Sequence, residues 1–275
     1  MVDAKQTVET RRRKYQIRHV AKILRNICRQ VHIANLIGFK TYLRYRFSRK
    51  GTVIPITIGT FDLNVRNGTK DLSSAISCLT GEFEILRNLL SADFDGVIVD
   101  AGSYIGAAAL ALNEMYPKSR IVCIEPSQKN IEVLRENVKG FENIEVIYAA
   151  LVGTDAQTVS LKNRGTGEWG LTVVEKPLDN QIAETLHETP AVTLHSLGIN
   201  IEDIGILKLD IEGAEYDLFR NDSMSLRKIN IVFAELHDKI IDGCTAQFFR
   251  FSEDRILIKT NSEKYLSIQN GYGLK

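Results

Sequence analysis

The sequence predicts an α/β fold, with a doubly wound, mostly parallel sheet, a C-terminal antiparallel hairpin and an N-terminal helical extension. From residue 96 onward, short apolar strands alternate with helical patterns, which is typical of a parallel sheet with helices on both faces. Two apolar runs near the C-terminus are close enough in sequence to pair as a hairpin. Before residue 50, apolar residues recur instead at helical spacing.

The expected elements follow one another in a regular order. One or two amphipathic helices lie between Tyr15 and Phe39, and two alternating runs around Gly59 form a hairpin. A helical stretch from about Asp71 to Ser91 leads into the main domain. We expect that domain to contain the strands GVIVD, RIVCIE, IEVIYA, GILKLD and INIVFAE, and a final hairpin of TAQFFRF and RILIKT.

Charge divides the chain into segments. Residues 1–50 carry 14 Lys and Arg against two acidic residues, a net charge of +12. The other 225 residues carry 21 basic and 32 acidic groups, a net charge of −11. We therefore predict a basic helical extension at 1–50, a hairpin and helix lead-in at 51–92, and the main domain at 93–275. In that domain, Ser127 is the expected N-cap of a helix.

The lack of a secretory signal and of a membrane-spanning run predicts a protein inside the cell. The longest apolar runs are too short to span a bilayer, and the N-terminus lacks the pattern of a secretory signal. The cysteines have no paired spacing, which argues against a zinc site or a disulfide framework and favours reduced thiols at Cys28, Cys78, Cys123 and Cys244.

A glycine turn joins the first strand of the main domain to the following helix. In DAGSYIG, Gly102 and Gly106 allow a sharp turn and a close approach to a ligand. Ligands of open α/β sheets bind at this edge. Glu125 ends the next strand, where its carboxylate can accept hydrogen bonds from both ribose hydroxyls of an adenosine group. The pattern predicts an adenosine-containing cofactor, against the alternative of an ordinary turn and a solvated acid.

The spacing of the turn distinguishes between adenosine cofactors. Dinucleotide sites use GxGxxG, which places a pyrophosphate on backbone N–H groups at a helix start. Here Tyr104 stands where the middle glycine would be, and its bulk crowds a diphosphate. S-adenosylmethionine has no phosphate to bind, so the sequence favours it over NAD.

Five segments, in order, resemble the FkbM family of methyltransferases: VIVDAGSYIGAAALAL, IVCIEPSQKNIEVLRENV, AALVG, ILKLDIEGAEYDLFRN and IVFAELH. The resemblance covers roughly residues 70–240, and its most specific parts are the IEP and KLDIEGAE boxes. It implies a Rossmann-like class I methyltransferase fold, S-adenosylmethionine as cofactor, and O-methylation, commonly of sugars or polyketide-type hydroxyls.

The resemblance also implies a cofactor site. It assigns Asp100, Gly102 and Gly106 to the methionine part of the cofactor and Glu125 to the ribose. Ala150 and Leu151 would lie near the adenine. The remaining expected contacts come from Glu84, Ser103, Tyr104 and Pro126. The family more often has Ala-Asn where this chain has Ser103-Tyr104.

Charged residues near the ends of two later strands are candidates for the chemistry. Lys208 and Asp210 share one face of a strand, and Asp210 ends it beside the expected methyl group. Glu212 and Glu215 either join this cluster or stabilise the start of the next helix. His237 could deprotonate a hydroxyl, since its ordinary pKa near 6.5 suits a base.

The predicted catalytic set is Asp210, His237 and Lys208, with no metal. A less favoured interpretation places Mg²⁺ or another divalent ion on Asp210, Glu235 and His237. Trp169, in a glycine-rich segment, is either a stacking surface for a sugar ring or ordinary packing.

The expected function is methyl transfer from S-adenosylmethionine to a hydroxyl oxygen of a sugar, a glycan or a related metabolite. One alternative is an RNA methyltransferase, but the acidic main domain and the lack of an (N/D)PP(Y/F) box disfavour nucleic acid as a partner. A second alternative is an inactive, methyltransferase-like docking protein.

The extension suggests a location at the inner face of the membrane, where a lipid-linked acceptor would be found. A helix with one apolar and one basic face lies in the interface of an anionic bilayer. The apolar stripe is Ile17, Val20, Leu24, Ile27 and Val31. The basic residues are Arg11, Arg12, Arg13, Lys14, Arg18, Lys22 and Arg25. Alternatively, the stripe packs on the acidic main domain and covers its site.

Overall fold

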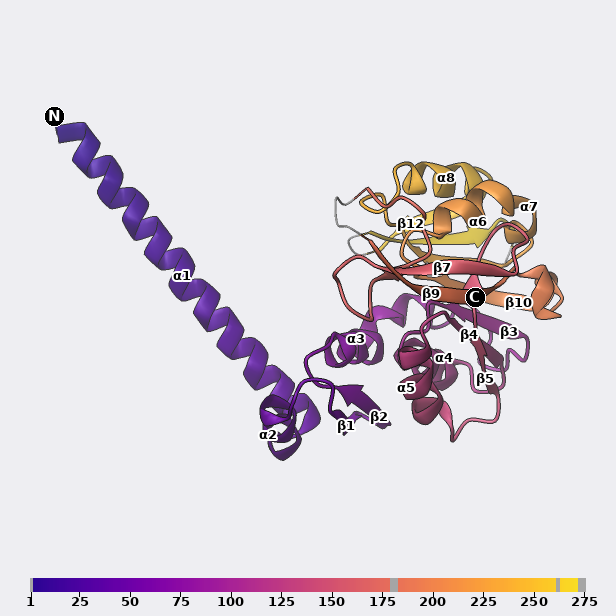
Figure 1. Ribbon diagram of the computed structural model, residues 1–275, viewed down its shortest axis with the longest axis horizontal. Helices are drawn as coiled ribbons and strands as arrows, with labels where there is room; N and C mark the ends of the chain where they lie inside the picture. The colour runs from indigo at the N-terminus through magenta and orange to yellow at the C-terminus, as the bar shows by residue number, and fades with distance from the viewer. Residues whose placement is uncertain (1, 179–182, 261–262, 272–275) are drawn as a thin grey trace.

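The computed structural model describes residues 2–178, 183–260 and 263–271, and it describes side chains from Tyr15 onward except those of residues 16 and 17 (Figure 1). The N-terminal extension consists of α1 (Val2–Ile37) and α2 (Phe39–Phe47). Figure 1 shows α1 projecting away from the rest of the molecule, which it meets near its C-terminal end. Among the described helices, none combines the length and the apolar character that a bilayer span requires.

The main sheet has seven strands and confirms the predicted doubly wound architecture. Its strands, from one edge to the other, are β12 (Arg255–Lys259), β13 (Lys264–Gln269), β11 (Ile231–Glu235), β10 (Ile204–Leu209), β3 (Val97–Ala101), β4 (Arg120–Glu125) and β5 (Ile144–Tyr148). The pairings from β11 to β5 are parallel. Strand β13 is antiparallel to both β11 and β12, so a C-terminal antiparallel hairpin is present, but it pairs β12 with β13 and not TAQFFRF with RILIKT.

Helices cover both faces of this sheet (Figure 1). Helices α4 (Ala107–Met115) and α5 (Gln128–Val138) pack on one face. Helices α6 (Glu215–Asn221), α7 (Ser223–Leu226) and α8 (Cys244–Phe251) pack on the other. Every residue of β3 is therefore buried, which explains its continuous apolar sequence. Helix α5 begins after Ser127, whose side chain accepts from the amide of Asn130, as the sequence predicted.

The lead-in segment packs into the same core as α4 and α5. It contains the predicted hairpin, β1 (Val53–Ile58) and β2 (Phe61–Arg66), followed by α3 (Asp71–Ser77). In β1, Ile54, Ile56 and Ile58 point inward and are buried in this core. The expected helix from Asp71 to Ser91 is wrong beyond Ser77, because the chain turns at residues 78–82, where Gly81 has φ 129°, and at residues 84–86.

The TAQFFRF segment was wrongly predicted as a strand. It lies in α8, and only RILIK forms the first strand of the hairpin. The buried residues Cys244, Phe248 and Phe251 are spaced by four and three positions, so they lie on one side of a helix. This helical period outweighs the strand preference of the phenylalanines.

A second, smaller sheet was not predicted. Its order is β6 (Ala150–Leu151), β9 (Glu184–Val192), β7 (Thr158–Asn163) and β8 (Leu171–Thr172). It is inserted between β5 and β10 and carries the glycine-rich segment that contains Trp169. It thereby brings that segment to the carboxyl edge of the main sheet, where Trp169 and Leu171 line a cavity.

Candidate functional site

A cavity of about 310 Å³ opens at the carboxyl ends of β3 and β10. These strands are neighbours, and the chain continues from β3 and from β10 toward opposite edges of the sheet. The cavity therefore lies at the topological switch point, where ligands of doubly wound sheets bind. Its volume falls in the range of about 300–1,000 Å³ that is usual for ligand sites. The predicted site residues that line it are Gly102, Ser103, Tyr104, Glu125, Pro126, Ala150, Leu151, Lys208 and Asp210.

The glycine turn is tightly packed against the end of β10. Gly102 has φ 76°, and a Cβ atom there would lie 1.8 Å from the carbonyl oxygen of Asp210. Gly106 has φ 84°, and its Cβ would lie 2.5 Å from Leu134 Cδ1. Only glycine satisfies both requirements at these positions. The turn and the residue that ends β10 are thus held in direct contact.

The backbone amides of the turn are already engaged within the chain. Gly102 N and Ser103 N donate to Ile124 O at 2.9 and 3.2 Å, and Gly106 N donates to Ser103 O at 2.8 Å. Tyr104 N donates to Glu125 Oε2 at 2.9 Å. A dinucleotide turn instead directs amides of this kind at a pyrophosphate. These four amides are therefore not available for a diphosphate, which agrees with the sequence argument against NAD.

Glu125 is buried at the end of β4 and lines the cavity. Its Oε1 accepts from Ser127 N at 3.0 Å and from Asn130 Nδ2 at 2.9 Å, while Oε2 accepts from Tyr104 N. A carboxylate has about four acceptor positions. One position on Oε2 is therefore left for a ribose hydroxyl, and the second ribose contact expected from the sequence would have to share an oxygen. Burial raises the pKa of Glu125 to about 7, against the opposing effect of its hydrogen bonds.

Asp100 and Lys208 form a buried ion pair beneath the turn. Lys208 Nζ lies 2.9 Å from Asp100 Oδ1 and donates to Gly102 O at 2.8 Å. Burial acts to lower the pKa of Lys208, but the carboxylates of Asp100 and Asp210 raise it above its usual value. Lys208 therefore stays an ammonium ion and cannot take a proton; it positions the turn. Asp100 is fully buried, and unlike Gly102 it is not among the residues that line the cavity.

Glu84 is one of three predicted cofactor contacts, with Asp100 and Gly106, that do not line the cavity. Its side chain is exposed and forms an ion pair with Arg87 at 2.9 Å. Glu82, two residues earlier, lines the cavity and pairs with Lys264. The early end of α3 explains the difference, because it changes which residues of this segment face inward.

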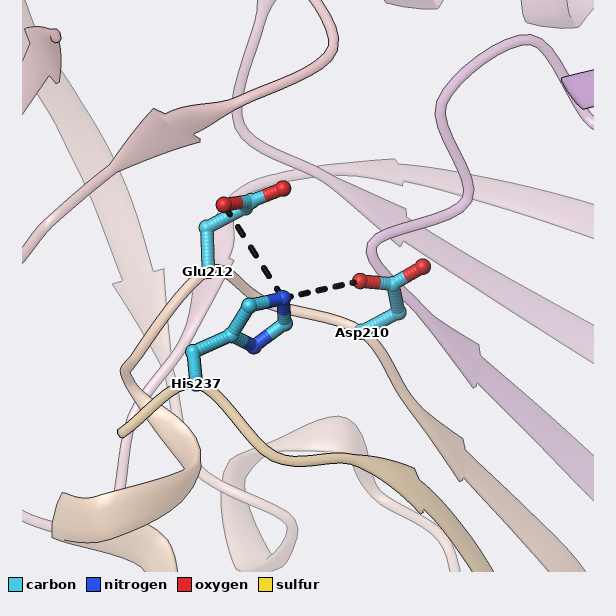
Figure 2. Close-up of side chains that lie close together, drawn as sticks. All are labelled: Asp210, Glu212 and His237. Carbon is cyan, nitrogen blue, oxygen red and sulfur yellow. Dashed lines mark ion pairs between the residues drawn. The ribbon is translucent and has the colours of Figure 1, made fainter. Parts of the chain in front are cut away.

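Asp210, Glu212 and His237 lie together beside the cavity (Figure 2). His237 Nε2 lies 3.8 Å from Asp210 Oδ1 and 3.9 Å from Glu212 Oε2. On the other side of the ring, Nδ1 lies 3.1 Å from Oε1 of the fully buried Glu215. Glu215 also accepts from the amides of Ile211 at 2.7 Å and Gly213 at 2.8 Å. It therefore both stabilises this turn and orients His237.

The carboxylates change the ionisation expected for His237. Burial acts to lower its pKa, but Glu215, Glu212 and Asp210 raise it to about 10. The sequence argument had assumed a value near 6.5, and the surrounding acids are the reason for the difference. Burial raises the pKa of Glu212 to about 8. Asp210, with about a third of its side chain exposed, is the cluster's most accessible carboxylate and lines the cavity.

Three features of the site were missed by sequence reasoning. Arg164 Nη2 pairs with Glu212 Oε2 at 2.6 Å, and the hydroxyl of Thr172 donates to Glu212 O. Asn130 connects Glu125 to Glu168 O. Arg164 and Thr172 come from the small sheet, so only its packing could reveal them. Asn130 had a local indication, because it is the third residue after the N-cap of α5 and faces the end of β4.

Comparison with known proteins identifies the family. The model of the methyltransferase FkbM domain matches residues 100–253, more than half of the chain. "Methyltransferase 1" of Beauveria bassiana is 28% identical over 173 residues, covering 56% of this chain and 69% of that protein. "2-O-methyltransferase NoeI" of Sinorhizobium fredii is 21% identical over 191 residues, covering 64% of this chain and 79% of that protein.

Among solved structures, M. jannaschii TYW2 in complex with AdoMet is similar, with a TM-score of 0.41 and 11% identity, over 81% of this chain and 86% of that chain. The strand order of the main sheet establishes the fold: the antiparallel strand β13 lies between β12 and the parallel strand β11. The chain is a methyltransferase with the Rossmann-like class I fold, and it belongs to the FkbM family.

Proposed function

We propose that the protein transfers a methyl group from S-adenosylmethionine to a hydroxyl oxygen of a sugar, a glycan or a related metabolite. The observation that carries this proposal is that one cavity lies between a glycine turn, four of whose amides bind within the chain, and a cluster of carboxylates beside an imidazole. The first part suits a donor without phosphates. The second supplies groups that can take a proton from a poor nucleophile.

The residues of the turn fit the methyl donor. Glu125 would hold the ribose, Gly102 and Ser103 the methionine part, and Ala150 and Leu151 the adenine. Among the described residues, six carboxyl groups line the cavity against three lysines. An acidic cavity favours a ligand that carries a sulfonium and an ammonium group, and it disfavours the phosphates of a dinucleotide or of RNA.

The protein's chemical task is alignment and proton removal. S-adenosylmethionine supplies a methyl carbon that is already electrophilic. The new oxygen–carbon bond forms as the sulfur–carbon bond breaks, the sulfur keeps the electron pair, and the hydroxyl proton passes to Asp210. Asp210 suits this role because its carboxylate reaches the cavity, whereas His237 stands behind it with Nδ1 bound to Glu215. Lys208 positions the turn through Gly102 O.

A sugar is the acceptor class that best fits the cavity wall. Trp169 lines the cavity and is partly exposed, so its ring offers a surface on which an apolar sugar face can stack. The similarity to a protein named as a 2-O-methyltransferase supports oxygen as the methylated atom. The acidic lining weighs against RNA, which was the alternative suggested by the basic extension.

Labelled S-adenosylmethionine and fractionated cell extract test this proposal. The purified protein should transfer label to the glycan fraction, and the product should gain the mass of one methyl group at an oxygen. Label that appears in RNA, or on nitrogen or carbon, would contradict the proposal. Binding of labelled cofactor without transfer to any fraction would support the inactive docking protein instead.

Cofactor affinity is expected to depend on pH through Glu125. The pKa of this carboxyl is about 7, so the group is mostly protonated at pH 6 and mostly ionised at pH 8. Ribose hydroxyls donate to the ionised form. Affinity for S-adenosylmethionine, measured by calorimetry, should therefore rise about tenfold from pH 6 to pH 8. Glu125→Gln should bind more weakly and lose this dependence; a variant with an unchanged pH profile would show that another group is responsible.

We also propose that the extension docks on the anionic inner face of a membrane. In α1, the apolar residues Val20, Leu24, Ile27 and Val31 are each more than half exposed. This exposure supports a docking surface over the alternative, in which the stripe packs on the main domain. The exposed residues Arg18, Lys22, Arg25 and Arg29 lie on the opposite face. The side chains of Arg11, Arg12, Arg13, Lys14 and Ile17 lie outside the described residues. A lipid-linked acceptor would be found at such a surface.

Vesicle co-sedimentation tests the docking surface in the full chain. The protein should pellet with phosphatidylserine-containing vesicles at low salt and should be released as salt screens the basic face. Replacing Val20, Leu24 and Ile27 together by Gln should abolish pelleting while keeping the helix. The double variant His19→Gln/Asn26→Gln, outside the stripe, should pellet like the wild type. Equal pelleting of the stripe variant and the wild type would contradict the proposal.

A further inference from the structure

We propose that Asp210, Glu212 and His237 form a binding site for a divalent cation of the Mg²⁺ or Mn²⁺ class. Each residue offers one ligand atom, and the three atoms lie within 4.8 Å of one another. They come from the end of β10, from the turn that follows it, and from the residues after β11, so the main sheet fixes their spacing. The cation site is inferred from geometry, while its use in catalysis rests on the proposed methyl transfer.

The distances suit ligands around one ion. His237 Nε2 is 3.8 Å from Asp210 Oδ1 and 3.9 Å from Glu212 Oε2, too far for hydrogen bonds (Figure 2). Two ligands each about 2.1 Å from an ion are separated by about 3 to 4 Å, depending on the angle at the ion. The separations to His237 fall in this range. The partly exposed side chain of Asp210 can close any remaining gap by rotation.

The orientation of His237 is that of a metal ligand. Its Nδ1 faces Glu215, which is fully buried and held by two backbone amides, so this nitrogen would keep its proton when a cation displaces the proton of Nε2. Its Nε2 then faces Asp210 and Glu212 (Figure 2). The ring is about nine-tenths buried, and within the described residues Nε2 has no hydrogen-bond partner. A carboxylate that fixes the second nitrogen of a ligand histidine is a recurrent feature of metal sites.

The local charge also favours a cation. Three carboxyl groups, from Asp210, Glu212 and Glu215, surround the ring of His237. The nearest opposing side chain is Arg164, which lies 2.6 Å from Glu212 Oε2 and so takes one acceptor position of that oxygen. The other position remains for an ion. Once Nε2 of His237 is unprotonated, these carboxyl groups outnumber Arg164, and a divalent cation would offset their charge.

Glu212 takes the place that the sequence interpretation gave to Glu235. Glu235 lies 3.1 Å from Lys264 Nζ and is held there as an ion pair. Glu212 has φ 53°, a left-handed conformation that turns its side chain back toward His237. Strand alternation suggested Glu235, which would share a face with His237. The same rule does not extend into the turn after β10, so it could not suggest Glu212.

The ligand set indicates the class of ion and its use. Two carboxylates and one imidazole, with remaining positions open to water or substrate, suit Mg²⁺ or Mn²⁺. An acceptor hydroxyl bound at an open position would lose its proton more readily, because a cation stabilises the alkoxide. The proton would still pass to a carboxylate at the cavity wall.

Mn²⁺ binding to the full-length protein, without methyl donor or acceptor, tests the site. In electron paramagnetic resonance titrations, the signal of free Mn²⁺ should fall until one ion is bound per chain, and Mg²⁺ should compete. Asp210→Asn and Glu212→Gln should each weaken binding at least tenfold. Glu235→Gln removes a carboxylate that lines the same cavity, and it should keep the wild-type affinity.

Circular dichroism and thermal unfolding of each variant show whether the fold is intact. If Glu212→Gln fails to fold, the Mn²⁺ affinity of Asp210→Asn tests the cation site. The proposal is overturned if the wild type shows no saturable binding. It is also overturned if Asp210→Asn binds Mn²⁺ like the wild type, or if only Glu235→Gln loses the ion. No activity is measured here, so failure of the cation site leaves the proposed methyl transfer to its own test.

Discussion

Replacing Asp210 by asparagine is expected to lower turnover by about 10²–10⁴-fold, the usual cost of losing a group that takes a proton. The amide has almost the shape of the carboxylate but cannot accept the hydroxyl proton. Because Asp210 follows β10 and Glu125 ends β4, with β3 between these two strands, affinity for S-adenosylmethionine should stay close to that of the wild type. Turnover is measured with the acceptor found in the glycan screen, and cofactor affinity by calorimetry.

The matched control is the same substitution at the other end of β10. Asp203 is exposed at the start of this strand, on the opposite edge of the sheet from the cavity. Asp203→Asn should turn over like the wild type. If Asp210→Asn also keeps wild-type turnover with normal cofactor binding, the proton is taken elsewhere, and the assignment of Asp210 fails.

The main strands could be predicted because their environment is uniform along their length. Strand β3 is buried at every position, so its apolar sequence is continuous and its limits are clear. The TAQFFRF segment could not be assigned in this way. Its apolar residues suit a strand, but the buried set Cys244, Phe248 and Phe251 forms one side of a helix. Whether this segment forms a helix or a strand depends on the surface against which its apolar residues pack, and the local sequence does not show that surface.

The cofactor half of the site was predictable for a related reason. Gly102 and Glu125 follow directly from the ends of β3 and β4, and parallel neighbouring strands bring their carboxyl ends together. The acceptor half was not. Glu212 reaches His237 only through a left-handed backbone angle, and Arg164 reaches Glu212 only through the small sheet. Neither the angle nor the sheet packing has a local signature in the sequence.

The structure also explains why two charged residues, Glu84 and Lys208, have other roles than the sequence suggested. The family resemblance implied that Glu84 contacts the cofactor, but the chain turns after Ser77 and Glu82 lines the cavity instead. Lys208 was expected to act in the chemistry because it shares a face with Asp210. Its ion pair with Asp100 and its bond to Gly102 O instead make it a support for the turn.

Replacing Gly102 by alanine is expected to disturb both halves of the site at once. The added Cβ would lie 1.8 Å from the carbonyl oxygen of Asp210, and this neighbour is backbone, so either the turn or the end of β10 must move. A left-handed φ of 76° adds about 1–3 kcal/mol of strain for alanine. We therefore expect the free energy of unfolding to fall by at least this amount in denaturant titrations.

The same movement should reduce turnover by about 100-fold, because a shift of about 1 Å at the reacting groups has that effect. Cofactor binding should also become weaker, because Gly102 lines the cavity and its amide, like that of Ser103, donates to Ile124 O. Gly140 offers a matched control, because a Cβ atom there meets nothing within 4 Å. Gly140→Ala should leave stability and turnover near wild type. A Gly102→Ala protein that binds cofactor and turns over normally would show that contact between this turn and β10 does not control the site.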